Sequence, residues 1–266
     1  MQLLVSVASA AEASAALAGG ADIVDAKNPR AGALGAVSLD TLTEIQLAVG
    51  GARPVTAAMG NASDEAAVEQ LSFEFAASGT SLVKVGFSGI CSATHLSALI
   101  AAAHRGADAG SRGHCGVVAV GYADDPASVT AAALVAIAAR AGARGILLDT
   151  ANKSGPGLPA LIDADALVPF VARAHDHGLF VALAGKLTAD DLVFMRDAGA
   201  DVAGVRGAAC EGGRNGRVSA DRVRQLLATL NGSRYTPATL SAARNASTRS
   251  ASTTAASTPP GSARVK

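Results

Sequence analysis

The sequence predicts a single-domain (β/α)8 barrel, the TIM-barrel class of α/β fold, followed by a disordered tail. Eight short apolar segments rich in β-branched residues recur along residues 1–230, and alanine-rich segments with helical spacing separate them. Eight strands that alternate with about eight helices over ~250 residues are typical of this barrel. An open, doubly wound sheet is the alternative, but no GxGxxG pattern opens the first helix and the eight units are similar in length.

The expected strands follow from the apolar segments, taken in chain order. They are "LLVSVA" (3–8), "DIVDAK" (22–27), "PVTAAM" (54–59), "SLVKVG" (81–86), "GVVAVGY" (116–122), "GILLDT" (145–150), "LFVALA" (179–184) and "DVAGVR" (201–206). Each is short enough for a barrel strand and is bounded by glycine or polar residues.

The expected helices occupy the intervals between these strands. They include "AAEASAALAGG" (10–20), "DEAAVEQLSFEFAASG" (64–79), "DPASVTAAALVAIAARAG" (125–142), "TADDLVFMRDAG" (188–199) and "DRVRQLLATL" (221–230). Several of them end in Gly after Ala, which is the usual left-handed stop before a following strand.

Composition changes abruptly near residue 230 and predicts two regions, a catalytic barrel over 1–230 and a tail over 231–266. The tail consists mainly of Ser, Thr, Ala, Pro and Arg and has too few large apolar residues to offset the entropy lost on ordering. It carries four Arg, one Lys and no acid, which leaves 17 basic and 22 acidic groups in the preceding part. The barrel is thus mildly acidic, and we expect no nucleic-acid partner.

Cysteine usage and the first residues of the sequence indicate the compartment. The three cysteines, Cys91, Cys115 and Cys210, lie far apart without CxxC spacing, so we expect neither a metal site nor a disulfide framework. The stretch "MQLLVSVASAAEAS" lacks a basic segment and is too short to cross a bilayer. A cytoplasmic enzyme without a membrane partner is the expectation.

Lysine is distributed unevenly and marks the expected active site. Only five lysines occur against 17 arginines, and four of the five, Lys27, Lys84, Lys153 and Lys186, fall at or just beyond the carboxyl ends of expected strands. In a barrel these ends meet at one mouth, where the active site lies. The lysines therefore predict a site for an anionic substrate, a carbonyl substrate or both.

Two acidic residues accompany these lysines. Asp25 and Lys27 are two positions apart, so both face the same side of their strand, while Asp149 and Lys153 end the sixth strand and enter its loop. A lysine that is desolvated and crowded by other cations loses its proton more readily, and a neutral amine attacks a carbonyl to form a Schiff base. Carboxylates can hold a lysine charged or transfer protons. The alternative for each pair is an interior salt bridge that only stabilises the barrel.

The loops after the seventh and eighth expected strands predict the phosphate site, as is common in such barrels. They read "ALAGKLTADD" (182–191) and "GVRGAACEGGRNGR" (204–217). Gly185 permits close approach of the backbone, Thr188 is a candidate helix cap, and Arg206 and Gly207 follow the eighth strand directly. We expect Gly185, Lys186, Arg206 and Gly207 to contact phosphate, although the glycines could serve only as turn formers.

Five motifs together resemble the (5-formylfuran-3-yl)methyl phosphate synthase (4-HFC-P synthase) family of methanofuran and methylofuran biosynthesis. They are "LLVSV", "GGADIVDAKNPRAGALGA", "VKVG", "LLDTANKSGPGL" and "ALAGKL", and the likeness covers about residues 1–230. The resemblance implies a lyase that converts two molecules of glyceraldehyde 3-phosphate into 4-(hydroxymethyl)-2-furaldehyde phosphate, with loss of phosphate and water and with no cofactor. Lys27 would form the Schiff base with dihydroxyacetone phosphate, and Asp25, Lys84, Asp149 and Lys153 would handle proton transfers.

Other functions stay open at this point. A simpler class I aldolase or another sugar-phosphate lyase would also use a lysine on a barrel, but lyases of the ribulose-phosphate-binding kind carry a DxKxxD motif on the third strand. Here Asp25 and Lys27 lie on the second, with Ala31 near the position of the second acid. A sensor that binds sugar phosphates without catalysis is the alternative from another class. A homo-oligomer that binds triose phosphates is expected.

Overall fold

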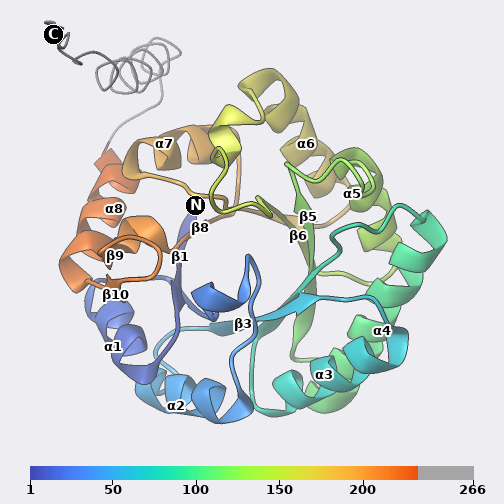
Figure 1. The fold of residues 1–266 in the computed structure, drawn as a ribbon, viewed down its shortest axis with the longest axis horizontal. Coiled ribbons are helices and arrows are strands. Elements are labelled where there is room, and N and C mark those ends of the chain that lie inside the picture. The colour runs from blue at the N-terminus through green and yellow to red at the C-terminus, as the bar shows by residue number, and fades with distance from the viewer. Residues whose placement is uncertain (233–266) are drawn as a thin grey trace, which may run out of the picture. The chain divides into compact units, whose positions relative to one another are not determined.

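Eight parallel strands close into a barrel with strand order β1 to β8, and helices surround it (Figure 1). The computed structural model describes residues 1–232. The barrel strands are β1 (Gln2–Val7), β2 (Ile23–Ala26), β3 (Val55–Asn61), β4 (Leu82–Gly86), β5 (Gly116–Tyr122), β6 (Gly145–Asp149), β7 (Phe180–Leu183) and β8 (Val202–Val205). The predicted barrel and each of its eight expected strands are confirmed, with ends that differ by at most two residues.

The outer ring consists of eight α-helices, and three short 3-10 helices lie in the loops of the described chain. The α-helices are α1 (Ala10–Ala18), α2 (Leu39–Val49), α3 (Glu65–Ala77), α4 (Ala93–Ser111), α5 (Ala131–Arg140), α6 (Ala164–Asp176), α7 (Ala189–Asp197) and α8 (Ala220–Gly232). The 3-10 helices are η1 (Pro29–Ala31), η2 (Leu158–Ala160) and η3 (Gly207–Ala209), and a two-stranded hairpin of β9 (Cys210–Glu211) and β10 (Arg217–Val218) follows η3.

Side-chain caps fix where the helices begin. Ser9, Ser38 and Ser92 each accept a hydrogen bond from a backbone N–H of the first turn, and Thr188 forms a capping box with Asp191. The fifth helix begins later than residue 125, because Asp125 accepts hydrogen bonds from the Ser88 hydroxyl and the Gly89 N–H and thereby holds a loop. The true cap is Thr130.

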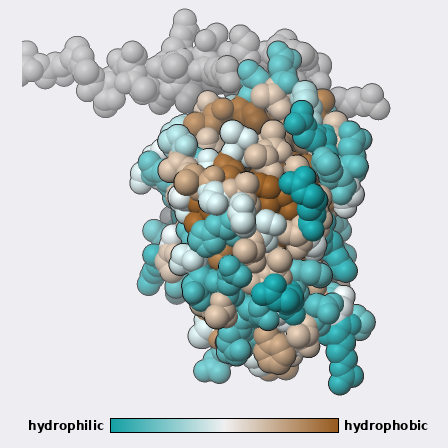
Figure 2. Space-filling view, turned by 90° about the vertical axis from the view of Figure 1, so that its right-hand side faces the viewer, coloured by the Kyte–Doolittle hydropathy of each residue, from teal (hydrophilic) through white to brown (hydrophobic). Residues whose placement is uncertain are grey.

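Strand alternation sends one set of side chains into the barrel interior. The barrel interior contains an apolar cluster that includes Leu4, Ile23, Ala58, Val118, Leu147, Ala182 and Val202. Since side chains alternate along a strand, Asp25 and Lys27 face the same interior as Ile23. The face seen in Figure 2 carries hydrophilic side chains toward its rim and lower part, with hydrophobic ones gathered in its upper middle.

The loop after β2 lies over the centre of the barrel (Figure 1). Leu34 of this loop is buried in the interior cluster, and its carbonyl accepts a hydrogen bond from the Gly60 N–H. Gly35 permits the tight fold, since a Cβ there would lie 2.4 Å from the Asn28 carbonyl oxygen. The segment 28–36, here called the β2 plug, therefore fills part of the mouth and confines the open space to the remainder.

Two further expectations concern the boundary of the C-terminal tail and the possibility of a membrane-spanning helix. Most of the expected tail, 231–266, lies outside the described residues, but Asn231 and Gly232 belong to α8, so the helix extends two residues beyond the predicted boundary. None of the helices within residues 1–232 has both the length and the apolar character needed to cross a bilayer.

Candidate active site

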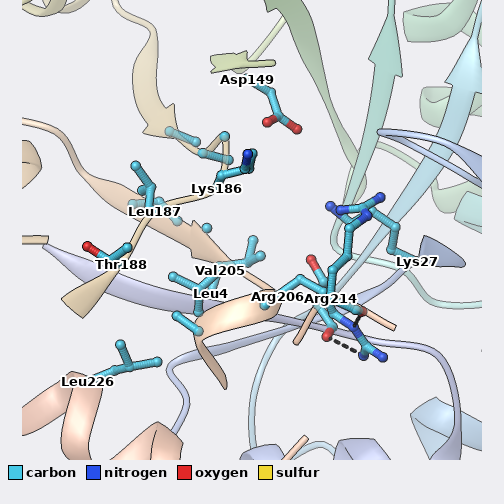
Figure 3. A pocket seen from close by; sticks show the side chains of 18 of the residues that line it. Leu4, Lys27, Asp149, Lys186, Leu187, Thr188, Val205, Arg206, Arg214 and Leu226 are labelled. Atoms are coloured by element: carbon cyan, nitrogen blue, oxygen red, sulfur yellow. Dashed lines mark hydrogen bonds between the residues drawn. The ribbon is translucent and has the colours of Figure 1, made fainter. Parts of the chain in front are cut away.

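A cavity of about 510 Å³ opens at the carboxyl ends of the strands (Figure 3). The strands and loops of β1, β2, β4 and β6–β8 line it. Of the residues predicted for the site, the cavity wall contains Lys27, Lys84, Asp149, Lys153, Gly185, Lys186, Arg206 and Gly207. Residues distant in sequence thus meet at one mouth, as the distribution of lysines predicts.

Asp25 lies just beneath the cavity and binds Lys84. Its carboxylate is fully buried and accepts hydrogen bonds from the hydroxyls of Ser6 at 2.9 Å and Thr56 at 2.8 Å. The Lys84 Nζ lies 2.6 Å from Asp25 Oδ2, and Lys84 is 5% exposed. Asp25 therefore pairs with Lys84 and, contrary to the pairing considered from the sequence, does not form its salt bridge with Lys27.

Lys27 is the unpaired amine of the site. It is 7% exposed, and within residues 1–232 its ammonium group has no hydrogen-bond or ion-pair partner. Burial lowers its pKa from 10.5 to about 8; Asp149 and Asp25 oppose this shift, while Lys84 and Lys153 add to it. Lys27 therefore combines access to the cavity with a readily lost proton.

Asp149 and Lys153 form the second carboxylate–lysine pair. The Lys153 Nζ lies 2.6 Å from Asp149 Oδ1 and 3.2 Å from the Thr150 hydroxyl. The loop that carries Lys153 is fixed by Asp124, whose carboxylate accepts hydrogen bonds from the Ala151 and Asn152 N–H groups at 2.6 and 2.8 Å. Burial lowers the pKa of Lys153, and Asp149 counteracts that shift. This pair can exchange a proton with a bound substrate.

The loops after β7 and β8 present backbone N–H groups to the cavity. The N–H groups of Gly185, Lys186, Gly207 and Ala208 donate to no acceptor in the described part of the chain. Gly185 has φ +108, and Lys186, at φ +57, directs its ammonium group to the Gly155 carbonyl. Free N–H groups beside the start of α7 provide donors for an anion.

Arg206 differs from the expectation that its side chain contacts phosphate. All five of its N–H donors are used within the protein: Glu12 accepts two, at 2.5 and 3.0 Å, and the carbonyls of Ser6, Arg214 and Gly216 accept the others. A guanidinium has five such donors and no more. We therefore correct the assignment: Arg206 braces β1 against the loop after β8.

Sequence reasoning missed three residues that shape the site. Ser6 and Thr56 lie level with Asp25 in the barrel register, which no local motif reveals. Arg214 lines the cavity from the turn between β9 and β10, and it extends toward the cavity near Lys27 in Figure 3. Its place in the loop after β8 was a signal that could have identified it. Within residues 1–232, no group of three or more His, Cys, Asp or Glu side chains could hold a metal ion.

Solved structures with similar folds include 3-hexulose-6-phosphate synthase from Salmonella typhimurium, at a TM-score of 0.62 and 18% identity over 86% of this chain and 98% of that one. At this identity the likeness concerns the fold alone. Native KDPGal, at a TM-score of 0.54 and 16% identity, covers 93% of this chain and 97% of its own.

Sequence relatives are considerably closer. The (5-formylfuran-3-yl)methyl phosphate synthase of Methanosarcina barkeri is 36% identical over 234 residues, which cover 86% of this chain and 98% of the relative. The protein of the same name from Methanopyrus kandleri is 38% identical over 244 residues, with the same coverage of both chains. The family model described as 4-HFC-P synthase matches residues 3–227. The chain therefore belongs to the 4-HFC-P synthase family.

Proposed function

We propose that this protein is a (5-formylfuran-3-yl)methyl phosphate synthase, which converts two molecules of glyceraldehyde 3-phosphate into 4-(hydroxymethyl)-2-furaldehyde phosphate in methanofuran-type cofactor biosynthesis. The observation that carries the proposal is Lys27, an unpaired amine with a lowered pKa in the wall of the cavity. Family membership supplies the substrate and the product. Together they support amine catalysis on a triose phosphate.

Lys27 starts the reaction by covalent catalysis. In its neutral form it attacks the ketone of dihydroxyacetone phosphate, which arises by isomerisation of one triose, and loss of water gives an iminium ion. The iminium withdraws electrons from the neighbouring carbon, so a base can remove a proton there and leave an enamine. The enamine carbon then attacks the aldehyde of the second triose.

The other charged residues support this chemistry from fixed positions. Asp149 and Lys153 share a hydrogen bond of 2.6 Å in the wall of the cavity, so they are placed to take and return protons. Lys84, paired with Asp25, stabilises negative charge that develops on oxygen and disfavours protonation of Lys27. Asp25 acts through Lys84, because it does not itself line the cavity.

The phosphate of the triose bound to Lys27 fits the free N–H groups of the loops after β7 and β8. Gly185, Lys186, Gly207 and Ala208 offer such groups at one side of the cavity. The start of α7 adds a favourable dipole. The backbone thus replaces the Arg206 side chain as the proposed phosphate ligand.

Two experiments test the function. Incubation with glyceraldehyde 3-phosphate alone, followed by mass spectrometry, should yield the furan aldehyde phosphate, and its absence contradicts the proposal. Borohydride reduction with dihydroxyacetone phosphate should leave a covalent adduct on Lys27. Lys27→Arg keeps the charge but cannot form this adduct, so it should make no product. Reversible binding without adduct or turnover would instead favour a sensor, and cleavage or aldol products without furan would favour a simpler aldolase.

A homo-oligomer and a cytoplasmic location stay predictions for this protein. Several large apolar side chains are exposed on the outer helices, among them Leu47 on α2, Phe73 on α3 and Val168 on α6. These three residues lie on three separate helices. Light scattering of the purified protein measures the oligomeric state, and cell fractionation measures the location.

A further inference from the structure

The proposed reaction brings two phosphate esters into one cavity, and the backbone N–H groups are assigned to one of them. The second phosphate needs a cation of the cavity wall that is not already used by another partner. Lys84, Lys153 and Arg206 each have a carboxylate partner, namely Asp25, Asp149 and Glu12. Lys27 serves as the amine, and Lys186 donates to the Gly155 carbonyl. Arg222 of α8 also lines the cavity but is exposed, and the loop after β8 supplies a further, half-buried cation.

Arg214 is that cation, and its guanidinium is only partly used. One terminal nitrogen, Nη2, donates to the carbonyls of Pro29 at 3.2 Å and Gly32 at 2.7 Å, both in the β2 plug. The Nε and Nη1 donors bond to nothing within residues 1–232, and no carboxylate pairs with the side chain. The two contacts to the plug hold the guanidinium in place and leave three N–H groups for a ligand.

The surroundings of Arg214 place its charge where the reaction occurs. The residue lines the cavity together with Lys27, Asp149 and Lys153, and Figure 3 shows its side chain extending toward Lys27. Its charge is also one of the causes that lower the pKa of Lys153. Planar arginine donors match the oxygens of a phosphate better than a lysine does.

We infer that Arg214 binds the phosphate group of the second triose, the one that leaves as inorganic phosphate. This inference rests on the proposed function. In that step a base removes the proton on the carbon next to the ester carbon, the C–H electron pair forms the new C=C bond, and the C–O bond breaks with its electron pair on the phosphate oxygen. Arg214 neutralises the charge that collects on this leaving group.

Arginine modification tests the binding of phosphate without reference to turnover. Phenylglyoxal is applied to the full-length protein with and without inorganic phosphate, and modified peptides are quantified by mass spectrometry. Phosphate should slow modification of Arg214 at least tenfold and leave that of Arg217, an exposed arginine on the same hairpin, unchanged. Equal rates at Arg214 with and without phosphate would overturn the inference.

Kinetics of Arg214→Gln test the role in elimination. The variant should still give the borohydride adduct of dihydroxyacetone phosphate on Lys27, because the first triose uses the backbone site, while furan formation falls at least a hundredfold. Arg214→Lys should recover part of the rate, and Arg217→Gln should behave as the wild type. Loss of the adduct would show that Arg214 only positions the plug, and an unchanged furan rate would show that it has no role; either result overturns the inference. If the wild type itself makes no furan, the proposed function fails, and the modification experiment still decides the phosphate site.

Discussion

Asp25 forms its ion pair with Lys84, at 2.6 Å, and not with Lys27, which lies two residues further along the chain and faces the same barrel interior. The two lysines, which both face the barrel interior, therefore differ in whether they have a carboxylate partner. Lys84 has a carboxylate within hydrogen-bond reach, whereas Lys27 has none in the described residues and its pKa falls to about 8. Because Asp25 pairs with Lys84, Lys27 is left without a carboxylate partner. The Lys84 ammonium group also places a second positive charge nearby, which helps to lower the pKa of Lys27.

The pKa of Lys27 predicts the pH dependence of adduct formation. With a pKa of about 8, roughly a tenth of the amine is neutral at pH 7. The rate of borohydride-trapped adduct formation should therefore rise about tenfold per pH unit below pH 8 and level off above it. Stopped-flow mixing followed by reduction measures this rate over about pH 6 to 10. A rate that is flat between pH 6 and 8 would assign the nucleophile to another group.

Lys27 should also lower the free energy of unfolding, because its amine is buried and its protonated form is disfavoured in the folded protein. Its pKa is about 8 in the folded chain and 10.5 in the unfolded one, so the unfolded chain binds more protons between these values and the wild type becomes more stable as pH rises through this window. Lys27→Met removes the penalty and should raise the free energy of unfolding by up to about 3 kcal/mol at pH 7, and by less at pH 10. Urea denaturation at both pH values measures the difference.

The matched control for this variant is Lys186→Met. Lys186 is exposed, so its replacement should change the free energy of unfolding by no more than about 0.5 kcal/mol. A gain for Lys186→Met equal to that for Lys27→Met would show that added hydrophobicity, not removal of a buried charge, stabilises the protein.

Removal of the Asp25 charge should destabilise the barrel strongly. Asp25→Asn leaves the Lys84 ammonium group buried without its counter-charge, which typically costs about 3 to 5 kcal/mol. Thermal and urea denaturation measure the loss, and the added change Lys84→Met should restore much of the stability but no activity. Glu69→Gln is the control, because its pair with Arg105 is 41% and 55% exposed and should contribute much less to stability. Equal losses in the two variants would refute a special role for burial.

The sequence predicts the fold well because the relevant signals are local. Strand period, N-caps and glycine stops each operate within a few residues, and Gly79 and Gly199, at φ +93 and +92, end their helices as expected. The convergence of the lysines follows from the fold alone, since parallel strands bring their carboxyl ends together.

The partners of each charged group could not be predicted in the same way. Whether Asp25 binds Lys27 or Lys84 depends on the stagger of β2, β3 and β4, which sets Asp25 level with Thr56 and Lys84 level with Ala58. Arg206 follows β8 like a phosphate ligand, yet Glu12, far away in sequence, occupies its guanidinium. Both pairings depend on the register of strands that are distant in the sequence, and this register cannot be predicted from a single sequence.

Gly185 should be needed for phosphate binding rather than for folding in general. Its φ of +108 disfavours any side chain, and a Cβ there would lie 3.0 Å from Thr150 Cγ2 and 3.1 Å from Leu158 Cβ, so Gly185→Ala must shift the loop that carries the free N–H groups. We expect the KM for glyceraldehyde 3-phosphate to rise about tenfold, equivalent to about 1.4 kcal/mol of binding. Gly178→Ala is the matched control: its φ is +73, a Cβ meets nothing within 4 Å, and the position lies away from the cavity. That variant should lose about 1 to 2 kcal/mol of stability to backbone strain while its KM stays unchanged. Steady-state kinetics and urea denaturation of both variants separate the two effects, and a normal KM in Gly185→Ala would remove this loop from the phosphate site.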